Sequence, residues 1–181
     1  MRAPLRLLCL FTSVIAGATL CLCLAVAAWA GAAGTGAPAP SPSAVSDPSG
    51  GAAPAALAAV TWALAQLGTP YRWGGEGDGG FDCSGLVQAA YAAAGIGLPR
   101  VAQDQFDVGP GLAPAATLEP GDLVFFGAGS GAVEHVGMVV APGMMVDAPH
   151  TGAEVRVEPF PTTVGARYGD QIYVGATRPA A

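Results

Sequence analysis

The chain has 181 residues, a formal net charge of −6 and only 11% charged residues, with no lysine. Nucleic acids and anionic membrane surfaces are themselves negatively charged, so an acidic chain is a poor partner for either, and we expect no nucleic-acid binding. The length favours one domain with room for a modest hydrophobic core.

Residues 1–30 have the pattern of an export signal. Arg2 and Arg6 precede an uncharged, mostly apolar run, and an Ala-x-Ala sequence ends at Ala30. This pattern predicts a signal peptide that is cleaved after Ala30. The apolar run is also long enough to span a bilayer, so the alternative is an uncleaved anchor. Membrane association is expected only in that case.

Residues 31–53 consist almost entirely of Ala, Gly, Pro and Ser, with Asp47 as the one acid. Such a segment lacks the large apolar side chains that a core needs, which predicts a flexible linker. We therefore place the folded domain at residues 54–181.

Three of the four cysteines lie in the first thirty residues, and Cys83 is the only one after them. A disulfide within the predicted domain is therefore impossible. A lone thiol in an exported protein is a candidate for reactivity. The alternative is a buried and inert cysteine, which is common in protein cores.

Hydrophobic periodicity divides the domain into a helical part and a strand-rich part. Helices are predicted at 54–68, from Cys83 to about residue 94, and at 101–106, with a turn at 69–75 and a loop at 76–80. Short strands are predicted, with a reversal of the chain at 141–143; they lie at 123–126, 135–140, 144–147, 155–158 and 172–174. Helices followed by antiparallel strands indicate an α+β fold.

The sequence Asp82-Cys83-Ser84-Gly85 leads directly into the second predicted helix. Asp is a favourable N-cap because its carboxylate accepts hydrogen bonds from the free amides of the first turn. This places Cys83 at a helix N-terminus, where the partial positive charge favours a thiolate. A thiolate is the nucleophile of cysteine enzymes, so Cys83 is the predicted nucleophile.

The chain has two histidines, and His135 is the better candidate for the base that serves a thiol. The predicted reversal folds Asp147 back beside His135, where a carboxylate can hold the productive tautomer of the ring. The alternative for Asp147 is a polar strand end that faces water. His150 lies beyond the strand and is the second candidate for the orienting role. Gly137 leaves space for a close approach of backbone or substrate.

Four segments in this order resemble the NlpC family of papain-like, cell-wall cysteine peptidases, and together they cover roughly residues 55–178. They are Pro70-Tyr71-Arg72-Trp73-Gly74-Gly75, Phe81-Asp82-Cys83-Ser84-Gly85-Leu86-Val87, Leu118-Glu119-Pro120-Gly121-Asp122-Leu123-Val124-Phe125-Phe126 and His135-Val136-Gly137-Met138. The resemblance implies a papain-like fold with N-terminal helices packed on a C-terminal antiparallel sheet.

The resemblance also implies roles for single residues. Cys83 corresponds to the family's nucleophile and His135 to its base. The third polar residue, usually His in the family, corresponds to Asp147 here, twelve residues after the base. Aspartate also holds an imidazole well in serine triads.

Three further positions match residues that bind the substrate or the transition state in the family. Tyr71 matches the aromatic residue whose hydroxyl helps to build the oxyanion site. Asp82 and Ser84 match positions that hold the amino end of the stem peptide. An acidic cleft formed by Glu76, Asp78 and Asp82 is expected to receive ammonium groups of such peptides, although a solvated loop is the alternative for these acids.

The expected function is that of a secreted cysteine endopeptidase that hydrolyses peptidoglycan stem peptides through an acyl-enzyme. The favoured bond is the γ-D-glutamyl–diaminopimelate bond. Two alternatives remain open: a non-catalytic peptidoglycan-binding relative, and a thiol amidase or acyltransferase on the same fold. We expect a monomer without a cofactor, and without a metal because two histidines and one thiol lack ligand spacing.

Overall fold

The computed structural model describes residues 52–129 and 131–179. The predicted signal peptide and residues 31–51 of the predicted linker lie outside the described residues, so the division of the chain into signal, linker and domain stays a prediction. Three helices are present in the described part of the chain: α1 (Pro54–Leu64), α2 (Cys83–Ala93) and α3 (Ala102–Val108). Among these described residues no helix combines the length and the apolar character that crossing a membrane requires.

The strands form a small hairpin and one larger sheet. β1 (Glu76–Gly77) pairs with β2 (Gly80–Phe81). The larger sheet has the order β6-β5-β4-β3-β8-β7 and is antiparallel throughout. Its strands are β3 (Leu123–Gly127), β4 (His135–Ala141), β5 (Met144–Asp147), β6 (Arg156–Pro159), β7 (Arg167–Tyr168) and β8 (Gln171–Thr177). Helices followed by an antiparallel sheet confirm the predicted α+β class.

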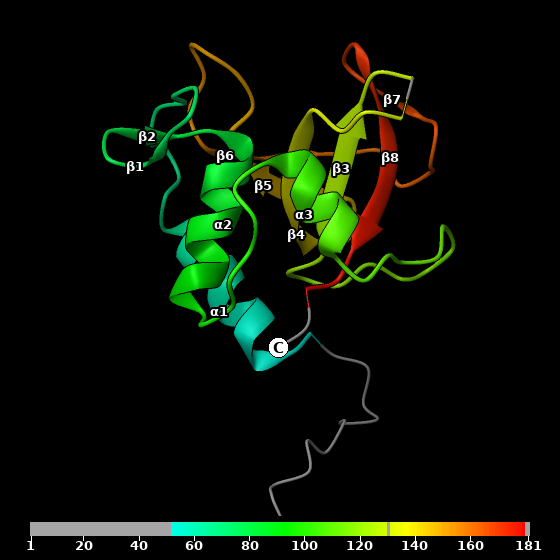
Figure 1. Ribbon diagram of the computed structural model, residues 1–181, viewed down its shortest axis with the longest axis horizontal. Coiled ribbons are helices and arrows are strands. Elements are labelled where there is room, and N and C mark those ends of the chain that lie inside the picture. Colours follow the sequence, from blue (N-terminus) through cyan, green and yellow to red (C-terminus); the bar gives the residue numbers. More distant parts are fainter. Residues whose placement is uncertain (1–51, 130, 180–181) are drawn as a thin grey trace, which may run out of the picture. The chain divides into compact units, whose positions relative to one another are not determined.

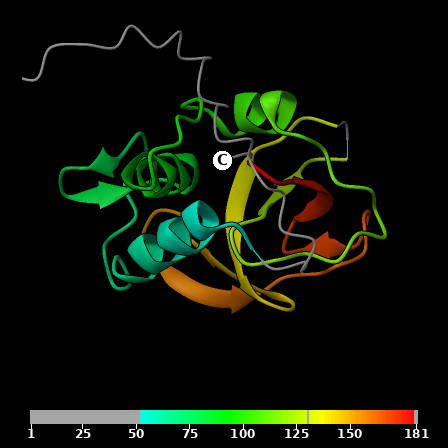
Figure 2. The same ribbon diagram turned by 90° about the horizontal axis from the view of Figure 1, so that it is seen from below.

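The core lies on both faces of the sheet, because alternate residues of a strand point to opposite faces. Leu123 and Phe125 of β3 belong to the cluster that α1 and α2 complete. Val124 and Phe126 belong to a second cluster with Phe160 and other residues. Figures 1 and 2 show α1 and α2 side by side next to the sheet. The sheet curls, because Tyr168 of β7 and Glu158 of β6, its two outermost strands, are hydrogen-bonded to each other. The short buried strand predicted at 123–126 is thus covered on both faces.

The first predicted helix ends earlier than expected. The prediction ran to Gly68, but α1 stops at Leu64 and residues 65–68 form a turn. The backbone N–H of Gly68 donates to the carbonyl of Val155 at 3.0 Å, next to the start of β6. The Gly68 N–H therefore bonds to the segment that enters β6 and not to a carbonyl of the helix, so the chain turns away from the helix before this residue.

Other boundaries shift by a few residues, and two features were not predicted. α3 continues to Val108, and β8 runs from Gln171 to Thr177 instead of covering 172–174 only. The predicted loop at 76–80 contains β1 and the start of β2, and β7 was not predicted at all. The missed hairpin and β7 consist of three two-residue strands, which are too short to show an alternating pattern.

Candidate active site

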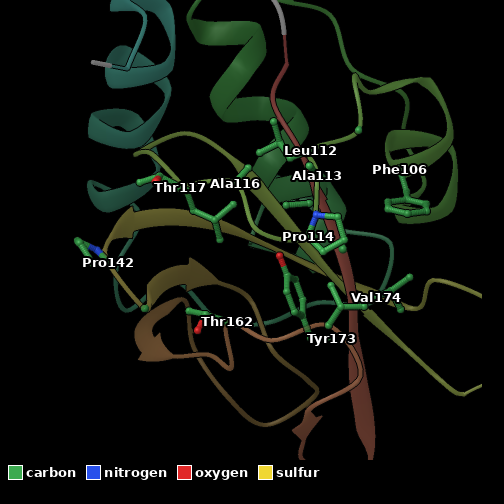
Figure 3. Close-up of a pocket in the computed structure, with 16 residues that line it drawn as sticks. Phe106, Leu112, Ala113, Pro114, Ala116, Thr117, Pro142, Thr162, Tyr173 and Val174 are labelled. Carbon is green, nitrogen blue, oxygen red and sulfur yellow. The ribbon is translucent and has the colours of Figure 1, made fainter. Parts of the chain in front are cut away.

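The candidate site is a cleft of about 1410 Å³ between the start of α2 and the curled sheet. It is lined by Cys83 and His135 together with Tyr71, His150 and charged side chains. A second cavity, of about 330 Å³, is shown in Figure 3; Tyr173 and Pro114 are among the residues that line it, which include no Cys, His, Asp, Glu or Arg. Of these two cavities in the described part of the chain, the larger one therefore contains a thiol and an imidazole that can act as nucleophile and base.

The N-cap of α2 fixes the position of the predicted nucleophile. Asp82 has extended backbone geometry, and its Oδ1 accepts from the backbone N–H of Gly85 at 2.7 Å. Its Oδ2 accepts from the N–H of Gly74 at 3.0 Å, which ties the turn before the hairpin to the same carboxylate. Cys83 is the first residue of α2 and is partly exposed, so its sulfur is held at a helix N-terminus as predicted.

His135 and Asp147 form a buried pair beneath the cleft. Nε2 of His135 lies 2.9 Å from Oδ2 of Asp147, with His135 6% exposed and Asp147 fully buried. Met138 of β4 is opposite Val146 of β5, so Asp147 is two residues from His135 along the ladder and faces the same side. With Nε2 engaged by the carboxylate, Nδ1 is the ring atom left for Cys83.

The charge state of His135 follows from its neighbours. Burial would lower the pKa of His135, but hydrogen bonds with Asp147 and Cys83, and the charges of these two groups, raise it to about 9. Burial raises the pKa of the Asp147 carboxyl, and the hydrogen bond with His135 opposes that effect. The arrangement favours an imidazolium that lies between a carboxylate and a sulfur at neutral pH.

His150, the second candidate for the orienting role, lies elsewhere in the cleft. It is exposed, and its Nδ1 lies 3.0 Å from the carbonyl oxygen of the neighbouring Thr151. Of the two candidates, Asp147 is the one that the fold brings to His135.

Tyr71 lines the same cleft as Cys83. Burial raises the pKa of the Tyr71 hydroxyl, and the charge of Cys83 raises it further. The hydroxyl therefore stays protonated and can donate a hydrogen bond at neutral pH.

Arg100 is a cleft residue that the sequence did not single out. Its guanidinium binds both oxygens of Asp82, with Nη1–Oδ1 and Nη2–Oδ2 distances of 3.0 and 2.7 Å. It also donates to Oγ of Ser84 at 3.0 Å and to Oε1 of Glu76 at 2.8 Å. The two predicted substrate-binding residues are thus already joined by a bidentate arginine. The only signal in the sequence was an arginine after a proline, which does not point to this partner.

Two expectations about the cleft are corrected by the structure. Asp78 is not among the residues that line it, so the acidic part of the cleft near α2 consists of Glu76 and Asp82. The space beside Gly137 is filled by the side chain of Met145, so this glycine serves packing in the core and not the approach of a substrate. Among residues 52–129 and 131–179, no cluster of three or more His, Cys, Asp or Glu side chains is arranged to hold a metal ion.

Known proteins share this fold and sequence. The Gamma-D-glutamyl-L-lysine dipeptidyl-peptidase of Bacillus subtilis is 41% identical over 100 residues, which are 54% of this chain and 33% of that protein. The Murein DD-endopeptidase MepH of Escherichia coli is 40% identical over 121 residues, covering 64% and 42% of the two chains. This chain therefore aligns with less than half the length of either relative.

Solved structures agree with these similarities. An NlpC/P60 family protein from Bacillus cereus superposes with a TM-score of 0.61 at 33% identity, over 70% of this chain and 40% of that one. The peptidoglycan hydrolase RipB from Mycobacterium tuberculosis gives 0.57 at 32% identity, over 70% and 65% of the two chains. The architecture is therefore the papain-like α+β fold. The model of the NlpC/P60 family matches residues 68–175, more than half of the chain, which therefore belongs to the NlpC/P60 family.

Proposed function

We propose that this protein is a cysteine endopeptidase that hydrolyses peptidoglycan stem peptides, with Cys83 as nucleophile, His135 as acid and base, and Asp147 as the residue that orients His135. The observation that carries the proposal is the 2.9 Å contact between His135 and Asp147, beneath the cleft into which α2 presents the Cys83 thiol. The names of the relatives in Bacillus subtilis and Escherichia coli support a peptidoglycan substrate.

The chemistry proceeds through a thioester. The Cys83 sulfur attacks the amide carbonyl, a carbon–sulfur bond forms, and the carbonyl π electrons move onto oxygen. The backbone N–H of Cys83, in the first turn of α2, and the Tyr71 hydroxyl stabilise that oxyanion. His135 gives its proton to the leaving amine as the carbon–nitrogen bond breaks. His135 then takes a proton from water, which attacks the thioester and releases the acid and the thiol.

The favoured bond is the γ-D-glutamyl–diaminopimelate bond. The relative in Bacillus subtilis is named for a γ-D-glutamyl bond, whereas the one in Escherichia coli is named for a DD bond. Near the nucleophile, Glu76 and Asp82 carry two negative charges against the single positive charge of Arg100. The remaining negative charge attracts the amino end of a stem peptide, which Asp82 and Ser84 bind next to Arg100.

The substrate places the site of action at the cell wall, outside the cytoplasmic membrane. We propose that residues 1–30 direct export of the chain and that residues 31–53 link this segment to the catalytic domain. The cleft draws on the residues of one chain, so we propose that a monomer is active.

Digestion of purified peptidoglycan by the full chain tests the function. Mass analysis is expected to find fragments with a new amino end on diaminopimelate and a new carboxyl end on the γ-carboxyl of glutamate. Cys83→Ser is the matched control and is expected to give no fragments. A parent chain that binds peptidoglycan without releasing fragments would instead establish the non-catalytic alternative.

A second digestion separates hydrolysis from acyl transfer. An added primary amine competes with water for the thioester. A hydrolase is expected to yield mainly free carboxylates, even with the amine present at millimolar concentration. A product that is mainly the new amide would identify an acyltransferase on the same scaffold.

A further inference from the structure

Tyr168 of β7 lies against the buried His135–Asp147 pair. Its ring is nearly parallel to the imidazole of His135, with centroids 6.0 Å apart and an angle of 11° between the planes. It also packs on Phe126 of β3, with centroids 4.4 Å apart. Contact with two rings fixes the orientation of Tyr168, and the same contact limits the rotation of the imidazole.

The Tyr168 hydroxyl connects the two edges of the sheet. It donates to Oε1 of Glu158 on β6, while Oε2 of Glu158 accepts from Nε of Arg156 at 2.7 Å. β6 and β7 are the two outermost strands in the order of the sheet. Arg156 is the register partner of Asp147, so this chain of hydrogen bonds, which forms part of the cleft lining, begins beside the carboxylate of the pair.

The Asp147 carboxylate has a polar atom that this chain of hydrogen bonds would keep away from solvent. Its Oδ1 is buried and accepts no hydrogen bond from the described residues, while Oδ2 faces His135. A buried carboxylate acts strongly on its imidazole partner, and exposure of its second oxygen to solvent would weaken that interaction by screening. Burial and the Asp147 charge both raise the pKa of the Tyr168 hydroxyl, which therefore remains a donor.

We propose that Tyr168 is a positioning residue of the peptidase, whose ring fixes the plane of His135 and whose hydroxyl, through Glu158 and Arg156, closes the curled sheet over Asp147. The proposal rests on the proposed function, because it assigns Tyr168 to the reaction of Cys83. The titratable and charged groups around His135 are Cys83 on α2, Asp147 on β5, Arg156 and Glu158 on β6, and Tyr168 on β7.

Titration of His135 by NMR tests the proposal without any substrate. The full chain labelled with ¹³C-histidine gives two histidine signals, and His150→Gln assigns them. In Tyr168→Leu the pKa of His135 is expected to fall from about 9 toward 6.5, by about one unit or more, because water screens Asp147. A folded Tyr168→Leu protein in which His135 titrates as in the parent would overturn the proposal.

Tyr173→Leu is the matched control. Tyr173 packs on the same Phe126 ring, at 5.7 Å, but does not line the cleft. Both leucine variants are expected to lower the melting temperature, since each removes a ring from the same aromatic cluster. Only Tyr168→Leu is expected to change the titration of His135. Equal changes in the two variants would mean that Tyr168 acts through general packing, and would overturn the proposal.

Tyr168→Phe isolates the hydroxyl and keeps the proposal testable if the leucine variant does not fold. It retains the ring on His135 and releases Glu158. Amide hydrogens of β5 are expected to exchange about tenfold faster, since one hydrogen bond that closes the sheet is lost. The pKa of His135 is expected to fall by less than in Tyr168→Leu. Exchange and titration identical to the parent would contradict the closing role.

Alkylation of Cys83 by iodoacetamide adds a readout of the nucleophile that is independent of peptidoglycan. Trypsin cleaves after Arg72 and Arg100, so the peptide 73–100 reports Cys83 separately from the other three cysteines. In Tyr168→Leu the alkylation rate near pH 8 is expected to fall about tenfold. If this fall occurs in a protein that releases no peptidoglycan fragments, the positioning role stands and the proposed function fails. A rate equal to the parent's overturns the positioning role.

Discussion

His135 joins the two parts of the site, because it lines the same cleft as Cys83 of α2 and contacts Asp147 of the sheet. Burial penalises an imidazolium and would lower its pKa, yet these two partners raise the pKa to about 9. The two partners therefore outweigh desolvation at this position. An imidazolium at this position is the acid that the proposed mechanism requires for protonation of the leaving amine.

The raised pKa predicts how activity depends on pH. The imidazolium is present below about pH 9 and is lost as the pH rises through that value. We therefore expect the alkaline limb of the kcat/KM profile of peptidoglycan cleavage near pH 9 and not near 6.5. Fragment release measured from pH 5 to 11 checks this, and a limb near 6.5 would contradict the ion pair. The same group stabilises the fold fully below about 6.5, with this contribution lost as the pH rises through about 9.

Replacement of Asp147 tests the orienting role. Asp147→Asn keeps an oxygen that accepts from Nε2 of His135 but removes the charge, so the alkaline limb is expected to move to lower pH. Asp147→Ala is expected to lower kcat/KM by about 10- to 100-fold without abolishing activity, since the proposed nucleophile Cys83 and the proposed base His135 remain. His150→Ala should lower it less. A larger loss in His150→Ala than in Asp147→Ala would reverse the assignment.

The sequence predicted which side chains meet at the cleft better than it predicted their surroundings. Cys83, His135 and Asp147 follow from local patterns: an N-cap, a strand start and a hairpin. Arg100 could not be recognised, because its partner Asp82 is eighteen residues away and no local pattern joins them. Tyr168 lies even further from His135 along the chain, on a strand of two residues.

Helix α1 shows why the spacing of apolar residues does not identify the buried face. Its buried residues are mainly alanines, whereas Leu57 is 47% exposed. A Cβ atom on Gly121 would lie 2.5 Å from Cβ of Ala56, so α1 passes very close to the turn before β3. Small residues on both elements allow this close approach, and a larger side chain on either element would push the helix away from the sheet.

A pair of glycine substitutions measures this packing. Gly121 and Gly95 both have a positive φ, of 97° and 84°, but a Cβ on Gly95 meets no atom within 4 Å. Gly95→Ala is expected to destabilise the fold by about 1 kcal/mol through backbone strain alone. Gly121→Ala adds the clash with α1 and is expected to cost about 1–3 kcal/mol more. Urea denaturation gives both values, and equal values would show that α1 moves freely.

Arg178, which follows β8, links the end of the described chain to the turn before β3. Arg178 donates to both oxygens of Asp122, at 2.7 and 2.8 Å, in the turn that precedes β3. Asp122 is only 2% exposed, so loss of the guanidinium leaves a buried carboxylate with fewer partners. The contact joins residues 56 positions apart and holds the last strand in place.

Arg178→Gln is therefore expected to lower the free energy of unfolding by about 2 kcal/mol. Arg167→Gln is the control, because Arg167 is an exposed arginine on the edge strand β7. It removes the same charge, and its expected effect is within about 0.5 kcal/mol. Denaturation of the two variants at low and high salt checks the difference, since a partly buried pair is screened less than a surface charge. Equal effects would show that Arg178 acts only through net charge.

The predicted fold class and helix–sheet order are confirmed, while the closure of the sheet was not predicted. Hydrophobic periodicity gives the strands one at a time and does not say how strongly the sheet twists. Closure depends on side chains from opposite edges, Glu158 and Tyr168, which meet only after the six strands have been ordered. The sequence of β6 is charged and mostly exposed, and it gives no sign that this strand contacts the opposite edge of the sheet.

That closure also affects how the molecule behaves at high concentration. Exposed edge strands are templates on which other chains add strands and aggregate. Here the edge strands have four and two residues, and they carry Arg156, Glu158 and Arg167. Short, charged edges leave little room for an intermolecular strand. Two of these side chains, Arg156 and Glu158, also belong to the hydrogen-bond chain that closes the sheet over Asp147, so they protect the sheet against self-association as well.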